Sequence, residues 1–103
     1  MTTVFVTVPE NSAEEIATTL IQEQLAACVN SVDCSSTYRW NGEIHTDTEA
    51  ILFIKTTAET YEKLKTRVKE LHPYDVPCIE RFEEDDVLSA YKSWIEESVI
   101  ADS

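Results

Sequence analysis

Apolar residues recur along this chain with two periods, and each period predicts a different kind of element. Runs of β-branched and alternating apolar residues predict strands over Thr3–Val8, Cys28–Trp40, Glu43–Thr56 and Cys78–Phe82. Between and after them, apolar residues three and four positions apart predict three amphipathic helices. Their expected buried stripes are Ile16, Leu20, Ile21 and Leu25; then Tyr61, Leu64, Val68 and Leu71; and finally Val87, Leu88, Tyr91, Trp94, Ile95 and Val99.

Two motifs led by a hydroxyl residue predict where helices begin. Ser12-Ala13-Glu14-Glu15 and Thr56-x-x-Glu59 both match the capping box, in which a hydroxyl and a glutamate three residues later satisfy exposed backbone amides. The first helix is then expected to run to Ala26 or Ala27. Residues after Ile100 are expected to fray, as chain ends commonly do.

The second helix is expected to end in His72-Pro73-Tyr74-Asp75-Val76-Pro77, the segment around which the chain is organised. Pro73 cannot continue a helix and disfavours the helical conformation at His72, so the helix ends at or before that histidine. An imidazole, a phenol and a carboxylate on such a rigid turn suit a binding site. The structural alternative is a histidine that satisfies the last carbonyl groups of the helix.

Asn41-Gly42 predicts a two-residue hairpin turn between the second and third strands. Without a bulge, this turn fixes which residues lie opposite one another: Trp40 and Glu43, Tyr38 and His45, Cys34 and Glu49, Asn30 and Phe53. Because side chains alternate along a strand, many of the reactive groups then project from one face of the hairpin. They are Cys28, Cys34, Tyr38, Trp40, His45, Glu49 and Lys55.

The order of the elements predicts an α+β fold. Strand–helix–strand–strand–helix–strand, followed by a third helix, is the pattern of a ferredoxin-like β-α-β-β-α-β sandwich, formed by residues 1–103 as a single domain. Two helices would cover one face of a four-stranded antiparallel sheet. Hairpin arms of about 12 residues reach roughly 40 Å, whereas a helix of about 15 residues covers about 22 Å. The long hairpin must therefore overhang its own helices.

The third strand is apolar on both of its faces. Ala50, Leu52 and Ile54 lie on one face, and Ile51 and Phe53 lie on the other. If helices cover only one side of the sheet, the second apolar face needs a partner, and a homo-oligomer would supply it. This pattern predicts association without fixing the number of subunits.

Acidic residues outnumber basic residues by 20 to 8, which gives a formal net charge of −12. Such a surface repels phosphate backbones and anionic lipids, so neither a nucleic acid nor a membrane is expected as a partner. Because molar salt screens self-repulsion, we expect a salt-adapted protein, with an ordinary acidic protein as the alternative. The sequence shows neither a signal peptide nor an apolar run long enough to span a bilayer, and we expect a cytoplasmic protein.

The three cysteines are Cys28, Cys34 and Cys78. Their odd number and the absence of C-x-x-C spacing predict free thiols rather than a disulfide framework or a closed zinc site. Copper prefers imidazole and thiolate ligands, so these thiols, His45 and His72 are the candidate ligands. For His45 a cross-strand surface pair is the favoured alternative, and Cys28 is expected to pack as a small apolar side chain.

Five stretches, in order along nearly the whole chain, resemble the CutA family, described as divalent-ion tolerance proteins. They are Leu25-Ala26-Ala27-Cys28-Val29-Asn30, Tyr38-x-Trp40-x-Gly42-x-Ile44, Glu49 with Ile54-Lys55-Thr56, His72-Pro73-Tyr74-x-Val76-Pro77, and Tyr91 with Trp94. The resemblance implies a ferredoxin-like subunit in a tight homotrimer, similar in architecture to the PII signalling proteins. It also implies a role in tolerance of copper and other divalent cations, with no established catalytic activity.

The chain departs from this family at the positions to which copper binding is attributed in some bacterial members. Those members carry a cysteine in the first strand and two adjacent histidines before the proline, whereas this chain has Val6, Leu71 and His72. Where members often have glutamate after Val-Pro, this chain has Cys78. Only His72 of that metal site is retained, and it is the predicted metal ligand.

We expect a binding site in a cleft between subunits, lined by Tyr38, Trp40, Glu49, Lys55, His72 and Tyr74. Lys55 ends an apolar strand and needs a carboxylate if it is buried, which Glu49 on the same face would supply. One function is a metal-tolerance protein that binds copper or another divalent cation at His72, with no cofactor required. The alternative is a PII-like sensor that binds a small anionic ligand near Lys55. No catalytic residues are predicted, because neither a nucleophile–base pair nor a phosphate-binding loop is present.

Overall fold

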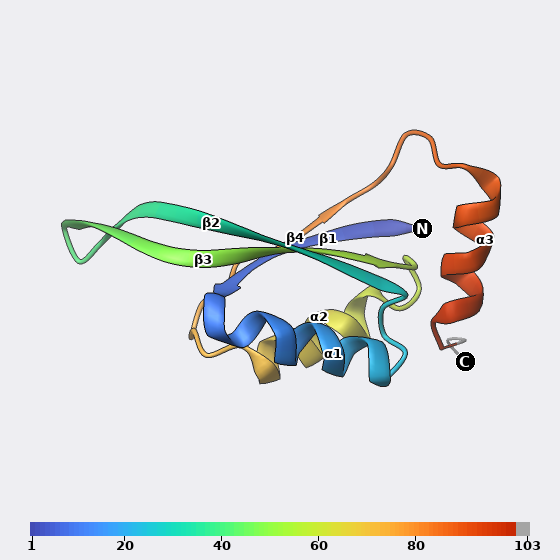
Figure 1. Cartoon of the computed structure of the whole chain (residues 1–103), viewed down its shortest axis with the longest axis horizontal. Helices are drawn as coiled ribbons and strands as arrows, with labels where there is room; N and C mark the ends of the chain where they lie inside the picture. The colour runs from blue at the N-terminus through green and yellow to red at the C-terminus, as the bar shows by residue number, and fades with distance from the viewer. Residues whose placement is uncertain (101–103) are drawn as a thin grey trace.

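The computed structural model describes residues 1–100, which form a four-stranded antiparallel sheet and three helices (Figure 1). The predicted order of elements is confirmed, and the strands lie in the spatial order β2-β3-β1-β4. The strands are β1 (Thr2–Pro9), β2 (Cys28–Trp40), β3 (Glu43–Thr56) and β4 (Ile79–Phe82). The helices are α1 (Ala13–Gln22), α2 (Tyr61–Leu71) and α3 (Ser89–Ser98), with a 3₁₀ turn η1 (Glu10–Ser12) before α1. The fraying expected after Ile100 lies outside the described residues.

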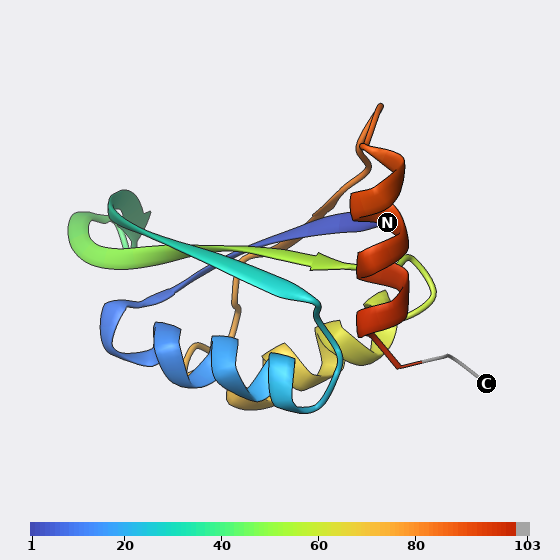
Figure 2. The same cartoon turned by 45° about the vertical axis from the view of Figure 1, so that its right-hand side comes forward.

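The central strands β1 and β3 pair from Thr2 opposite Thr56 to Pro9 opposite Glu49. Alternate residues of this pair face α1 and α2, which lie together on one side of the sheet (Figure 2). The core they form is buried and almost entirely aliphatic, and burial of such side chains is the main driving force for folding. It includes Val4, Val6, Val8, Ile16, Leu20, Ala50, Leu52, Ile54, Leu64 and Val68.

The hairpin of β2 and β3 extends well beyond the two helices, as the length argument predicts (Figure 1). The chain reverses at Asn41 and Gly42, whose φ angles of 52° and 79° suit the predicted two-residue turn. All four expected cross-strand pairs are present. The molecule is therefore elongated, with extents of 45 × 26 × 20 Å.

Neither predicted capping box forms its side-chain hydrogen bond, although α1 begins at Ala13, directly after Ser12, as predicted. Ser12 ends the 3₁₀ turn, and its side chain makes no capping hydrogen bond to α1. Thr56 remains in β3, where its hydroxyl donates to the carbonyl oxygen of Leu25 at 2.7 Å. Helix α2 consequently begins only at Tyr61. In both cases another local or tertiary arrangement competes successfully with the cap.

The helices are also shorter than expected. Helix α1 ends at Gln22 rather than near Ala26, because Gln24 adopts a φ of 58° and the chain turns toward β2. Helix α3 begins at Ser89, after the predicted start of its stripe, and buries Ile95 completely. Three residues of the predicted buried stripes are exposed: Ile21, Leu88 and Trp94.

No helix lies over the middle of the sheet face opposite α1 and α2 (Figures 1 and 2), and this face carries an aromatic cluster. Phe5 packs edge-on against Phe53 and Phe82, with ring centroids 5.7 and 6.5 Å apart. Helix α3 stands at the end of the sheet away from the hairpin tip. The second apolar face predicted for β3 is therefore open in the single chain. No helix within residues 1–100 is both long and apolar enough to cross a membrane.

Candidate functional site

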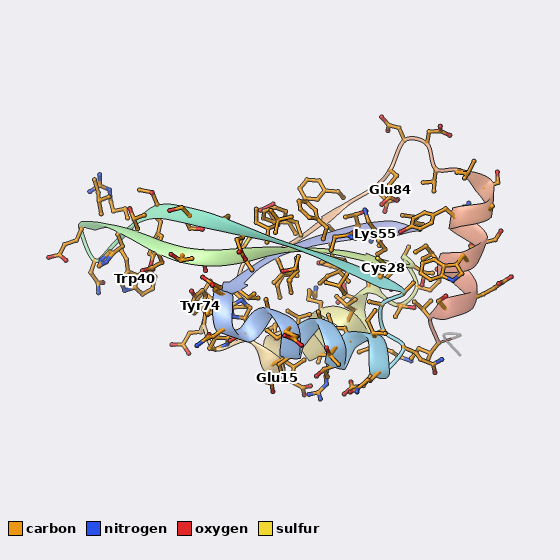
Figure 3. The ribbon with its side chains drawn as sticks, viewed as in Figure 1. Glu15, Cys28, Trp40, Lys55, Tyr74 and Glu84 are labelled. Atoms are coloured by element: carbon orange, nitrogen blue, oxygen red, sulfur yellow. The ribbon has the colours of Figure 1, made fainter. Side chains whose placement is uncertain are left out.

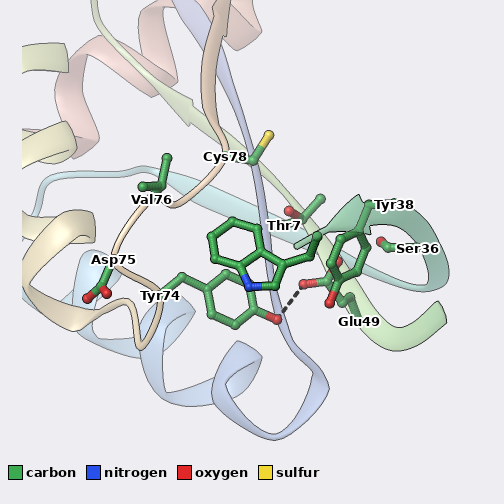
Figure 4. A pocket seen from close by; sticks show the side chains of 9 residues that line it. Thr7, Ser36, Tyr38, Glu49, Tyr74, Asp75, Val76 and Cys78 are labelled. Carbon is green, nitrogen blue, oxygen red and sulfur yellow. Dashed lines mark hydrogen bonds between the residues drawn. The ribbon is translucent and has the colours of Figure 1, made fainter. Parts of the chain in front are cut away.

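A cleft of about 550 Å³ opens where the hairpin passes the segment between α2 and β4 (Figure 4). Its walls come from β1, β2, β3 and that segment, so residues far apart in sequence meet there. A cavity of this size is typical of small-molecule sites. The lining residues are Thr7, Ser36, Tyr38, Trp40, Glu49, Tyr74, Asp75, Val76 and Cys78.

Glu49 is the least exposed charged side chain of the cleft, with an exposed fraction of 5%. Strand β3 places it opposite Pro9 on β1 and Cys34 on β2. Its Oε2 accepts a hydrogen bond of 2.8 Å from the phenol of Tyr74, the dashed line in Figure 4. Burial, this hydrogen bond and the charge of Glu49 raise the pKa of Tyr74 to about 12. The phenol therefore stays protonated and acts as the donor.

Tyr38 forms a second pair of a phenol and a carboxylate beside the first. Its hydroxyl donates to Asp47, and this hydrogen bond is the main reason that its pKa is raised. Its ring also stacks on that of His45, with centroids 5.8 Å apart, which is the cross-strand pair favoured for this histidine. Trp40, two residues further along the same face of β2, is 60% exposed.

His72 lies next to Tyr74 and is only 7% exposed. Its Nε2 lies 2.7 Å from the carbonyl oxygen of Thr7, and its Nδ1 accepts a hydrogen bond of 3.2 Å from the backbone N–H of Tyr74. A carbonyl oxygen can only accept, so Nε2 carries a proton, whereas Nδ1, as an acceptor, carries none. Helix α2 ends at Leu71, and His72 is already extended, as Pro73 requires. Nε2 thus holds the segment after α2 against β1, and Nδ1 fixes the turn within that segment.

The described residues do not form a metal site within one chain. No group of three or more histidine, cysteine, aspartate or glutamate side chains among residues 1–100 is placed to hold a metal ion. The cysteines are free, as predicted, and partly buried. A metal ion would bind His72 only if one of its two hydrogen bonds broke. The role of His72 as a metal ligand therefore stays a prediction.

Lys55 lies on the same face of β3 as Glu49 but six residues further along, roughly 20 Å away. Figure 3 shows Lys55 near Glu84 toward α3, while Trp40 and Tyr74 lie toward the hairpin. The structure thus brings four of the six predicted cleft residues together and leaves Lys55 and His72 outside the lining. The four are Tyr38, Trp40, Glu49 and Tyr74.

Lys55 belongs instead to a second polar cluster at the α3 end of the sheet. Its Nζ donates to the hydroxyl of Thr3 at 3.2 Å, and that hydroxyl donates to Glu84. Oε1 of Glu84 is buried and has no hydrogen-bond partner within the part of the chain that the structure describes. Burial, with Cys28 and Glu84 nearby, raises the pKa of Tyr91. The carboxylate next to Lys55 in this chain is therefore Glu84, reached through Thr3, and not Glu49.

Five lining residues were missed by the sequence reasoning: Thr7, Ser36, Asp75, Val76 and Cys78. The alternation of side chains along strands would have found two of them, because Thr7 shares a face with Phe5 and Ser36 shares one with Tyr38. Asp75 and Val76 lie in the segment that was singled out, yet no local signal showed which of its side chains face the hairpin.

Replacing Tyr74 should change how stability depends on alkaline pH. Its folded-state pKa of about 12 lies above the ordinary value of 10.0, so its contribution is complete below pH 10 and is lost as the pH rises toward 12. The free energy of unfolding, measured by urea denaturation between pH 9 and 12, should fall more steeply for the wild type than for Tyr74→Phe. Because the side chain is 41% exposed, screening limits the difference to about 1 kcal/mol. Equal slopes would show that Tyr74 ionises normally in the folded protein.

Comparisons with known proteins agree with this architecture. The chain matches the family model described as CutA1 divalent ion tolerance protein over residues 2–98. It is 44% identical over 96 residues to the Divalent-cation tolerance protein CutA of Pyrococcus horikoshii, which covers 92% of this chain and 94% of that one.

Two solved structures share the fold. The PII-like protein CutA from Nostoc sp., in apo form, superposes with a TM-score of 0.94 at 32% identity, covering 97% of this chain and 98% of that one. The Periplasmic divalent cation tolerance protein CutA from Archaeoglobus fulgidus superposes with a TM-score of 0.93 at 34% identity, covering 97% and 100%. With a family match over almost the entire sequence and the same fold in these relatives, this chain belongs to the CutA1 divalent ion tolerance protein family.

Proposed function

We propose that this protein is a homotrimeric, PII-like binding protein of the cytoplasm, which takes a small molecule in the cleft of Tyr38, Trp40, Glu49 and Tyr74. The observation that carries the proposal is the cleft itself, about 550 Å³ in volume, with an almost fully buried carboxylate among three aromatic side chains. The Nostoc relative is named PII-like, which supports a sensing or interaction role. Because the Archaeoglobus relative is named periplasmic, cell fractionation is the test of location.

Assembly into a homotrimer would cover the open face of the sheet. That face carries Phe5, Phe53 and Phe82, and Phe82 is 53% exposed in the single chain. An apolar face on an otherwise highly charged chain is typical of a surface between subunits. A copy that packs there would also lie beside the overhanging hairpin. The number three follows from the resemblance to PII-like trimers.

Light scattering in molar KCl should give a mass three times that of the chain, because salt screens the repulsion between subunits of net charge −12. We also propose a salt-rich cytoplasm as the setting of this protein. If that is correct, the trimer should be more stable in molar KCl than in dilute buffer. Phe53→Asp should dissociate the trimer, since a buried carboxylate without a partner costs several kcal/mol. Thr18→Asp, on the exposed side of α1, is the matched control and should not dissociate it. A wild-type monomer at micromolar concentration would contradict the proposal.

A thermal-shift screen of intracellular small molecules tests the binding role. A ligand that binds only the folded state raises Tm, by an amount that grows with its concentration relative to its Kd. We expect at least one compound whose shift is present in the wild type and in Thr18→Asp, and is lost in Trp40→Leu and Glu49→Gln. Circular dichroism would verify that both cleft variants fold. Shifts that persist in the two cleft variants, or a complete absence of shifts, would remove the cleft as a ligand site.

A divalent cation, copper included, is the second candidate ligand, because relatives are named for divalent-cation tolerance and His72 is the predicted ligand. A copper titration followed by electron paramagnetic resonance compares the wild type with His72→Ala and with His45→Ala, the other imidazole. Saturable, nitrogen-coordinated binding lost only without His72 would support the metal role. We expect weak binding unchanged by His72→Ala, because both nitrogens of that ring are already bonded and 20 acidic residues bind divalent cations diffusely.

A further inference from the structure

The cleft carries negative charge and aromatic rings, and no lysine or arginine is among its lining residues. Glu49 and Asp75 contribute carboxylates, and a third, Asp47, holds the hydroxyl of Tyr38. Two imidazoles lie beside the lining: His72, whose Nδ1 accepts a hydrogen bond and so carries no proton, and His45, which stacks on the ring of Tyr38. The charges among the lining residues themselves therefore have one sign.

The lack of positive charge among the lining residues matters most for Glu49. A carboxylate removed from water needs a counter-charge or several hydrogen-bond donors. Glu49 is 5% exposed and accepts a hydrogen bond from Tyr74, yet no ion pair joins it to a lysine, arginine or histidine within residues 1–100. A ligand that brings positive charge to Glu49 would complete its environment.

Three aromatic side chains that line the cleft with this carboxylate are exposed in the single chain. Tyr38, Trp40 and Tyr74 are 42%, 60% and 41% exposed, which is high for side chains that proteins usually bury. The face of an aromatic ring attracts a cation, most strongly in tryptophan. Both tyrosines also donate their hydroxyl hydrogens to carboxylates, so negative charge lies at the rim of each ring.

We infer that the ligand of this cleft is an organic ammonium ion, whose charged head lies against Glu49 and the rings of Trp40 and Tyr74. The inference rests on the proposed binding function and names its ligand class. An apolar cavity with a few well-placed polar groups suits an amine with an apolar body. This class replaces the small anionic ligand predicted near Lys55, because Lys55 lies roughly 20 Å from Glu49 along β3.

The test compares three probes that have nearly the same shape and differ in charge: choline, the neutral 3,3-dimethyl-1-butanol and the anionic 3,3-dimethylbutanoate. Putrescine and spermidine extend the cations to primary amines. The full chain carrying Trp94→Phe keeps Trp40 as its only indole, so fluorescence reports on the cleft, and calorimetry repeats each titration on the wild type. All titrations are made at one high ionic strength. We expect at least one cation to bind saturably, about tenfold or more tightly than the neutral and anionic probes.

Two variants and one control place the cation in the cleft. Glu49→Gln removes the charge but keeps the shape, and Trp40→Leu removes the indole; each should weaken cation binding about tenfold in calorimetry. Glu96→Gln removes an exposed carboxylate from α3, at the end of the sheet away from the hairpin (Figure 1), and should leave binding unchanged. This control separates the cleft from the diffuse attraction of an acidic surface for any cation.

Three results would overturn the inference. The first is cation binding that is equal in all three variants, and the second is no saturable binding by any of the cations. The third is a neutral or anionic probe that binds in the cleft as tightly as the best of the cations, which would leave the proposed binding function standing. If the thermal-shift screen also yielded no cleft-dependent ligand, the proposed function would fail together with the inference.

Discussion

The antiparallel register of β1 against β3 is the constraint on which the rest of the structure depends. It directs Val4, Val6 and Val8, with their partners on β3, toward the two helices, and so sends the intervening residues to the opposite face. A slip by one residue would exchange the two sets and place Glu49 and Lys55 in the aliphatic core. The same register sets Glu49 beside Pro9 and Lys55 beside Thr3, so opposite charges occupy opposite ends of one face.

Much of the fold could be predicted because it follows from local patterns. A period of two or of about 3.6 identifies a strand or a helix, and Asn41-Gly42 fixed the complete hairpin register. The start of α2 could not be predicted in the same way. Thr56 has the side chain of a capping residue, yet its hydroxyl binds the carbonyl of Leu25, 31 residues away. A tertiary hydrogen bond that cannot be read from the sequence thus forms in place of the one that the local motif predicts.

Some features of the candidate site could likewise be predicted from local patterns, and others could not. Tyr38, Trp40 and Glu49 could be grouped because the hairpin register places them on one face. Lys55 was grouped with them for the same reason, but a shared face fixes direction and says nothing of distance along the strand. The contact of His72 Nε2 with the carbonyl of Thr7 spans 65 residues, so no residue pattern around the histidine could show it.

The overhang of the hairpin gives the cleft two walls of different stiffness. Glu49 and Thr7 lie where β3 is paired with the central strand, whereas Tyr38 and Trp40 belong to a two-stranded ribbon that projects past the helices. Any bending of this ribbon would change the width of the cleft without disturbing the core, because the core lies under the paired central strands. At its tip, a side chain on Gly42 would meet no atom within 4 Å, so the residue is constrained by its positive φ alone. A substitution at Gly42 would therefore change the twist of the ribbon. Although the turn contributes no atom to the cleft, that change of twist would alter the width of the cleft.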